Sequence, residues 1–332
     1  MIVGREETDR LASALKRRFG EGARIENLNV PSVGGSSRTY VFDLIDGTSR
    51  RRLVSRTETY AGKNSPFLSP REQFALIAYV FEKGFLVPEP MFEYDDADQM
   101  GFGFVTTFVE GATLPKTVIQ SAQLEGARAH FAQQCGALLA ALHRMPLSGV
   151  PFLRGRPDST DAIAAQRDRY LSYGILRPAI ELGLRWLERN RPAPRPGVLL
   201  HGDFRVGNLM VAEKGIAAVL DWECSHLGSP AEDLGWLCTR AWRFGRPDLV
   251  AGGIDSLEAL LDAYEKSGGV RLGADEVRYW MIFGLVRWAI LNVMQARGHL
   301  DGERRSVVFA ACGRNTNLIE YDLLMTLKGE YA

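Results

Sequence analysis

The strand-like and helical parts of this 332-residue chain are separated, and the change falls close to residue 110. Before it, the amphipathic pattern at 6–19 predicts one helix, and a second predicted helix ends at Gly84. Short apolar runs separated by Gly, Ser and Asp predict strands at 23–30, 38–45, 51–56, 91–94 and 102–109. Residues 1–110 are therefore expected to form a sheet of about five antiparallel strands with helices.

Residues 111–332 show a different pattern, dominated by helical periodicity. The predicted helices occupy 122–145, 161–189, 255–267, 275–297 and 303–327. Strand-like runs occur only around 197–221, after a connector rich in Arg and Pro at 189–197. The sequence thus predicts an α+β protein with two domains, 1–110 and 111–332.

Charge and hydropathy exclude several classes of partner. The 40 Lys and Arg residues balance the 40 Asp and Glu residues, so no net field attracts a nucleic acid or an anionic membrane. The most apolar run, Met281 to Met294, contains Arg287 and is shorter than the roughly 20 residues that cross a bilayer. The first ten residues carry charges where a secretory signal needs an apolar run, and we expect a cytoplasmic protein without nucleic-acid or membrane partners.

The segment VLLHGDFRVGNLMVAEKGIAAVLDWE (198–223) carries the polar residues best suited to chemistry. Asp203 follows an apolar run, Asn208 comes five residues later, and Asp221 follows a second apolar run. Two short strands flanking a tight loop would bring these three side chains together. Such a set suits phosphoryl transfer, because one carboxylate orients the attacking hydroxyl while an amide and a second carboxylate bind magnesium on nucleotide phosphates.

The same segment resembles a known catalytic motif. HGDFRVGN followed by LDWE is similar to the catalytic loop and metal motif of the aminoglycoside phosphotransferase and choline kinase superfamily, the small-molecule relatives of protein kinases. The resemblance implies that Asp203 is the catalytic base and that Asn208 and Asp221 bind Mg²⁺. It also implies a catalytic role for Arg205, which lies where protein kinases carry a lysine that touches the transferred phosphate. Asp233, in a following GxPxxDLxW run, is expected to tie the loop to the next helix.

A glycine-rich segment upstream resembles the phosphate-covering turn of that family. PSVGGSSRTYVFDL (31–44) lies between two predicted strands. The resemblance implies that Gly34 and Gly35 let the backbone approach the ATP phosphates and that Ser36 or Ser37 donates hydrogen bonds to them. An ordinary hairpin turn is the alternative interpretation.

Two further segments match the order of the family's nucleotide-binding elements. Arg56 lies where the third-strand lysine of a kinase belongs, and Glu72 lies where its helix glutamate belongs, although an unrelated surface pair would give the same pattern. The run FVTTFVEG (104–111) resembles the hinge that reads the adenine edge. The implied contacts are Thr107, Phe108 and Val109.

The resemblance implies a bilobal protein-kinase-like fold that binds ATP and Mg²⁺ in a cleft. DFRVGNLM, DWECSHLGSPAEDLGW and RAWRFG are most similar to the branch with the kinase domains of acyl-CoA dehydrogenase family members 10 and 11, which is associated with hydroxyacyl-CoA acceptors. We expect transfer of the γ-phosphate to a hydroxyl of a small molecule. An antibiotic phosphotransferase, a silent nucleotide-binding scaffold and a metal-dependent hydrolase using His201, Asp203 and Asp221 are the alternatives.

The charge of residues 144–197 bears on the acceptor. Ten basic residues face five acidic ones in this segment, which favours an anionic acceptor over a polycationic aminoglycoside. A solvated basic face is the alternative. The arginines proposed as anion partners are Arg154, Arg156, Arg185, Arg189, Arg240, Arg243 and Arg246.

Overall fold

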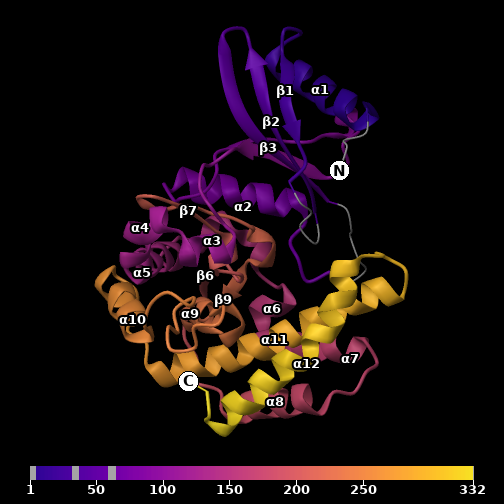
Figure 1. Cartoon of the computed structure of the whole chain (residues 1–332). Helices are drawn as coiled ribbons and strands as arrows, with labels where there is room; N and C mark the ends of the chain where they lie inside the picture. Colours follow the sequence, from indigo (N-terminus) through magenta and orange to yellow (C-terminus); the bar gives the residue numbers. More distant parts are fainter. Residues whose placement is uncertain (1–4, 32–36, 59–64, 332) are drawn as a thin grey trace. The chain divides into compact units, whose positions relative to one another are not determined.

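A computed structural model describes residues 5–31, 37–58 and 65–331. The chain divides into two compact units, Met1–Glu110 and Gly111–Ala332 (Figure 1). The predicted α+β class is confirmed, because the N-terminal unit carries an antiparallel sheet and the C-terminal unit is mainly helical.

The N-terminal unit is built on a five-stranded sheet with the order β1-β2-β3-β5-β4, in which every neighbouring pair is antiparallel. The strands are β1 (Arg24–Asn29), β2 (Ser37–Asp46), β3 (Ser49–Glu58), β4 (Pro90–Glu93) and β5 (Gly103–Thr107). A two-residue turn joins β2 to β3, and Gly47 within it has φ +59°, a conformation that glycine adopts without steric cost.

Two helices belong to the N-terminal unit. Helix α1 (Arg5–Phe19) buries Leu11, Ala14 and Leu15 in the same apolar core as Phe42 of β2. Helix α2 (Pro70–Glu82) begins with a capping box, in which the Ser69 side chain accepts from the Glu72 backbone N–H and the Glu72 side chain accepts from the Ser69 backbone N–H. Local capping and apolar periodicity therefore explain both helices.

The C-terminal unit consists of helices and two small β-ribbons. Its helices are α3 (Pro115–Gln120), α4 (Glu125–Ala129), α5 (Phe131–His143), α6 (Pro157–Thr160), α7 (Ala162–Ser172), α8 (Pro178–Arg189), α9 (Pro230–Cys238), α10 (Leu257–Lys266), α11 (Ala274–Leu300) and α12 (Val307–Lys328). The ribbons pair β6 (Val198–Leu200) with β9 (His226–Gly228), and β7 (Leu209–Ala212) with β8 (Gly215–Val219). Helix α11 packs against α7, α8, α9 and α12, so it forms the centre of the unit (Figure 1).

The prediction of one continuous helix at 161–189 is wrong, because residues 173–177 are not helical. The chain breaks there into α7 and α8, because Gly174 adopts φ +62° and Pro178 begins the second helix at its first turn. The predicted helix at 122–145 is likewise divided into α4 and α5 at His130. The short strand β9 was not predicted.

Helix α11 contains the most apolar run of the chain, Met281 to Met294, and extends beyond it at both ends. Among the described residues, it is the one helix long and apolar enough to cross a bilayer, yet 83% of its most apolar window is buried inside the structure. Such burial is typical of the core helix of a globular unit.

Candidate active site

The loop that carries Asp203 is held in place by a buried carboxylate from α9. Asp233 accepts hydrogen bonds from the backbone N–H groups of His201 and Gly202, both at 2.8 Å. Burial alone would raise the pKa of Asp233, but hydrogen bonds from His143 and from the backbone N–H of Gly202 hold this pKa below its ordinary value. The expectation that Asp233 ties the loop to the following helix agrees with this geometry.

The backbone at Gly202 leaves no room for a side chain. Its φ is +76°, and a Cβ at this position would lie 2.2 Å from the carbonyl oxygen of Cys224. Only glycine fits a turn of this shape at this close approach. The glycine of the HGD sequence is thus required by the path of the backbone.

His201 acts as a buried brace. Its Nε2 lies 2.9 Å from the carbonyl oxygen of Leu220, and its Nδ1 accepts from the backbone N–H of Asp203 at 3.1 Å. These partners fix the tautomer with the proton on Nε2. Burial lowers the pKa of His201 although Asp233, Asp203 and Asp221 oppose the shift, so the ring is neutral.

Three donors fix the carboxylate of Asp203. Its Oδ1 accepts from Arg205 Nε at 3.0 Å and from Trp236 Nε1 at 2.7 Å. Its Oδ2 accepts from Asn208 Nδ2 at 2.6 Å. The side chain is 14% exposed, so it is held firmly and still reachable. Such a carboxylate can accept the proton of a hydroxyl bound beside it.

Asn208 and Asp221 lie at the same end of the β7–β8 ribbon. The backbone N–H of Leu220 donates to the carbonyl oxygen of Asn208 at 2.8 Å, and Asp221 follows Leu220 directly. Asp221 adopts φ +68°, a left-handed conformation that is uncommon for a residue with a side chain. The structure therefore brings the three polar residues of the motif to one end of one ribbon.

The donor chemistry at this end fits a hard divalent cation. Asn208 uses Nδ2 for two hydrogen bonds to Asp203, and within the part of the chain described its Oδ1 accepts none. An amide oxygen and the Asp221 carboxylate are ligands that Mg²⁺ accepts. No cluster of three or more His, Cys, Asp or Glu residues suited to a metal occurs among the described residues.

Arg205 lies between the predicted base and an indole ring. Its guanidinium stands 4.7 Å from the centre of the Trp242 ring while Nε bonds to Asp203. Burial alone would lower the pKa of Arg205, but Asp203 and Asp221 raise it, so the side chain stays charged. A cation in this position can neutralise charge that develops on a phosphoryl group.

The predicted phosphate-binding turn lies mostly outside the described residues. Gly34, Gly35 and Ser36 are not described, and only the backbone of Ser37 is, as the first residue of β2 opposite Glu58.

The other predicted nucleotide contacts occupy the N-terminal unit. Arg56 lies in β3 opposite Thr39 of β2 and Phe104 of β5. The Glu72 carboxylate accepts from the backbone N–H and the hydroxyl of Ser69, both at 2.8 Å. The Glu72 side chain therefore takes part in the capping box at the start of α2.

The predicted hinge residues follow the last strand of the N-terminal unit. Thr107 ends β5, and Phe108 donates its backbone N–H to the carbonyl oxygen of Arg52 at 2.9 Å. The Arg52 guanidinium covers the Phe108 ring at 4.4 Å. Val109 follows in irregular structure and is partly exposed.

Much of the positive charge at 144–197 is neutralised locally. Five of its arginines form ion pairs, Arg167 with Glu188, Arg169 with Asp158, Arg177 with Glu320, Arg191 with Asp161 and Arg195 with Glu276. Two of these acids, Glu276 and Glu320, come from helices that lie later in the sequence. Outside the segment, Arg243 is buried on the carbonyl oxygens of Cys238 and Pro247, and Arg240 pairs with Asp322. The net positive charge counted for residues 144–197 therefore overstates the positive field that this segment presents to a ligand.

Two residues of the site were not predicted from the sequence. Trp236 contacts Asp203 from α9, and Arg287 donates from α11 to the carbonyl oxygen of Gly202 at 2.6 Å. Trp236 closes the GxPxxDLxW run, which is the one sequence signal that pointed to it. Arg287 interrupts an apolar run, and its packing beside the loop depends on tertiary structure.

Comparison with known proteins gives a consistent assignment. Residues 28–272 match the family described as "Phosphotransferase enzyme family". Acyl-CoA dehydrogenase family member 11 of Mus musculus is 26% identical over 312 residues, which cover 84% of this chain and 39% of that protein. The chain thus spans well under half the length of this relative.

Solved structures show the same fold at low identity. A protein from Ralstonia eutropha, provisionally named an aminoglycoside phosphotransferase, superposes with a TM-score of 0.69 at 20% identity, over 97% of this chain and 98% of its own. Spectinomycin phosphotransferase, solved with ADP and spectinomycin, superposes with a TM-score of 0.65 at 14% identity, over 96% and 98% of the two chains.

Proposed function

Because the chain belongs to the phosphotransferase enzyme family, we propose that it moves the γ-phosphate of ATP to a hydroxyl group of a small molecule in a magnesium-dependent reaction. The resemblance predicted from HGDFRVGN and LDWE is thereby confirmed at the level of the family. The observation that carries the proposal is the contact of Asn208 with Asp203, at the ribbon end where Asp221 also lies. A base and two hard oxygen ligands are the parts that such a reaction needs.

In this proposal Asp203 orients the acceptor. Its carboxylate accepts a hydrogen bond from the acceptor hydroxyl, whose oxygen forms the new bond to the γ-phosphorus as the bond to the bridging oxygen of ADP breaks. The hydroxyl proton passes to the carboxylate and then to solvent. Trp236 and Arg205 hold the carboxylate in one orientation, which favours attack in line.

Asn208 and Asp221 would hold Mg²⁺ through the amide oxygen and the carboxylate. When bound, the ion supplies positive charge that stabilises the phosphates of the nucleotide. Gly34, Gly35, Ser36, Ser37, Arg56, Glu72 and Thr107 to Val109 remain the proposed nucleotide contacts on the strength of the sequence resemblance. ADP in the structure of spectinomycin phosphotransferase supports a nucleotide as the donor.

The acceptor class has two candidates. Similarity to acyl-CoA dehydrogenase family member 11 supports the sequence-based proposal of a hydroxyacyl-CoA or a related anion. An antibiotic acceptor is the second candidate, because a structural neighbour was solved with spectinomycin. A silent scaffold is disfavoured, since the base and both predicted metal ligands are present together.

The proposal is tested by acceptor-dependent ADP formation. The purified chain is incubated with Mg²⁺-ATP and, separately, 3-hydroxybutyryl-CoA, 3-hydroxybutyrate, spectinomycin and choline, and phosphorylated products are identified by mass spectrometry. The proposal expects phosphate on the hydroxyl of at least one acceptor and no transfer without Mg²⁺. ATP that neither binds nor is consumed with any acceptor would contradict it.

A further inference from the structure

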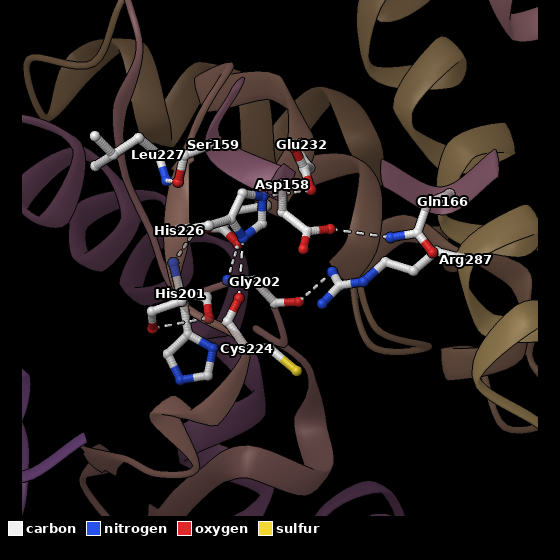
Figure 2. A network of polar contacts seen from close by, with 12 residues as sticks. Asp158, Ser159, Gln166, His201, Gly202, Cys224, His226, Leu227, Glu232 and Arg287 are labelled. Carbon is white, nitrogen blue, oxygen red and sulfur yellow. Dashed lines mark hydrogen bonds and ion pairs between the residues drawn. The ribbon is translucent and has the colours of Figure 1, made fainter. Parts of the chain in front are cut away.

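Arg287 lies directly behind the candidate catalytic loop. Its side chain reaches from α11 to Gly202, where Nη1 donates to the carbonyl oxygen next to Asp203 (Figure 2). The residue is only 7% exposed. Its guanidinium also stands 4.8 Å from the centre of the Trp236 ring, and the Trp236 indole N–H in turn contacts Asp203. One side chain therefore separates this cation from the predicted base.

The charge of Arg287 has no direct counterion. In the described part of the chain, no carboxylate oxygen lies within 4.0 Å of its guanidinium nitrogens, and its one hydrogen bond is the one to Gly202. Buried arginines are ordinarily paired, because an uncompensated charge is costly to desolvate. The structure thus places a lone, almost buried cation beside the loop.

The acids nearest to Arg287 are already paired with other cations. Asp158 lies 2.9 Å from Arg169, Glu232 lies 3.0 Å from His226, and Asp203 lies 3.0 Å from Arg205. Figure 2 shows Asp158, Glu232 and His226 close to Gly202, to whose carbonyl oxygen Arg287 donates. Burial alone would lower the pKa of Arg287, but Cys224 and these acids raise it, so the charge persists.

Aromatic rings adjoin this cation. Trp236, Trp242 and Trp288 follow one another with ring centres 5.4 and 5.1 Å apart, and we call these three residues the tryptophan row. Arg287 covers one end of the row at Trp236, and Arg205 covers its middle at Trp242. The indole N–H of Trp242 is buried and finds no hydrogen-bond partner among the described residues. Trp236 and Trp242 are themselves buried, so the row packs aromatic rings behind the two arginines, which supply positive charge next to Asp203.

We propose that Arg287 binds the anionic group of the acceptor, a carboxylate or a phosphate, while the acceptor's hydroxyl lies at Asp203. This inference rests on the proposed function and adds the acceptor's class and the residue that selects it. Arg287 contributes the charge that the ion-paired arginines of 144–197 do not present. Its bond to Gly202 keeps the guanidinium beside the loop, and the anion takes the remaining N–H groups.

The test offers acceptors in pairs that differ in charge. The probes are 3-hydroxybutyrate against butane-1,3-diol, and glycerol 3-phosphate against glycerol, with choline as a cation, each with Mg²⁺-ATP. We expect transfer to an anionic member of a pair at higher kcat/KM than to its neutral partner. Comparing 3-hydroxybutyrate with glycerol 3-phosphate shows whether the site prefers a carboxylate or a phosphate.

Variants of Arg287 separate binding from support of the loop. Arg287→Gln is expected to raise KM for the preferred anion by about 10- to 100-fold, as for loss of a charge-assisted hydrogen bond. Its Kd for ATP should stay within about twofold, and Arg287→Lys should recover part of the loss because it keeps the charge. The matched control is Arg314→Gln at an exposed position of α12, which should resemble wild type.

Three results would overturn the inference. The first is an equal kcat/KM for the anionic and neutral members of each pair. The second is a higher kcat/KM for choline or spectinomycin than for any anionic acceptor. The third is an Arg287→Gln variant whose kcat falls equally for every acceptor while KM is unchanged. Each of these leaves the proposed function standing, because phosphate is still transferred. A chain that binds no ATP and transfers no phosphate contradicts the proposed function itself.

Discussion

Asn208 donates both hydrogens of its amide group to Asp203, one to the main-chain oxygen at 2.9 Å and one to Oδ2 at 2.6 Å. The predicted metal ligand therefore also orients the predicted base. Replacing Asn208 removes an oxygen donor and, at the same time, releases one oxygen of the carboxylate that receives the proton. The two roles are coupled by geometry, and their contributions to turnover are not expected to add.

Neutralising Asp203 should abolish turnover with little effect on nucleotide binding. In Asp203→Asn the side chain keeps its shape but cannot take a proton, so kcat should fall by about 10²- to 10⁴-fold. The Kd for ATP, measured by calorimetry, should change by less than about threefold. The control is Asp168→Asn on the exposed face of α7, which should retain wild-type kcat. Wild-type transfer by Asp203→Asn would rule out its role as the base.

Trp236→Phe removes one donor to Asp203 and keeps an aromatic ring against Arg287. Loss of the indole N–H leaves Oδ1 held by Arg205 alone, and kcat should fall by about 10- to 100-fold, as for a hydrogen bond to a charged group. Trp280→Phe is the matched control, because the Trp280 indole N–H is buried with no partner among the described residues. Steady-state kinetics should leave Trp280→Phe near wild type. Equal losses in the two variants would show that the indole N–H of Trp236 has no special role.

Asp233→Ala should destabilise the C-terminal unit. The change removes a buried carboxylate that holds two backbone N–H groups and His143, and breaking such a network costs about 3–5 kcal/mol. The pKa of Asp233 is lowered in the folded state, so its contribution is present above its ordinary pKa and is lost as pH falls through the folded value.

Urea unfolding of Asp233→Ala and wild type at pH 7, well above the ordinary pKa of Asp233, measures this contribution. Asp262→Ala, at an exposed pair with Lys266, is the control and should change the free energy of unfolding by less than about 1 kcal/mol. A loss for Asp233→Ala as small as that of the control would contradict the structural role.

His226 should make stability depend on pH near 8. Nδ1 lies 2.9 Å from the carbonyl oxygen of Cys224 and Nε2 lies 3.0 Å from a carboxylate oxygen of Glu232, so both nitrogens face acceptors. Burial alone would lower the pKa of His226, but Glu232 and Asp158 raise it to about 8. The raised pKa contributes about 2 kcal/mol of stability below pH 6.5, and this contribution is lost as pH rises through 8.

The measurement is the free energy of unfolding of wild type and His226→Gln between pH 6 and pH 8.5. The difference between the two should shrink as pH rises, whereas the exposed His130→Gln should show no such trend. A difference that stays constant over this range would show that His226 is neutral when folded.

The sequence sufficed where local patterns determine structure. Short apolar runs between turn residues predicted the strands from 24 to 58, and the residues before and within α2 predicted that helix. The spacing of Asp203, Asn208 and Asp221 predicted their convergence, because a ribbon with a short loop leaves few other arrangements.

The sequence failed where contacts between distant segments decide. The break between α7 and α8 depends on a left-handed Gly174, which a continuous apolar pattern hides. The donor from Trp236 and the lone charge of Arg287 arise only when α9 and α11 pack beside the loop. Arg177 pairs with Glu320, and Arg195 pairs with Glu276. Both acids lie outside residues 144–197, so counting charges within that segment could not show that these two arginines are neutralised.

The most direct test of the account is the binding of Mn²⁺, as a paramagnetic substitute for Mg²⁺, to the chain in the presence of ATP. Electron paramagnetic resonance should show one bound Mn²⁺ in wild type. Its affinity should fall by at least about 10-fold in Asn208→Ala and in Asp221→Asn while ATP still binds. Unchanged Mn²⁺ affinity in both variants would contradict the claim that these two side chains hold the metal of a phosphotransferase.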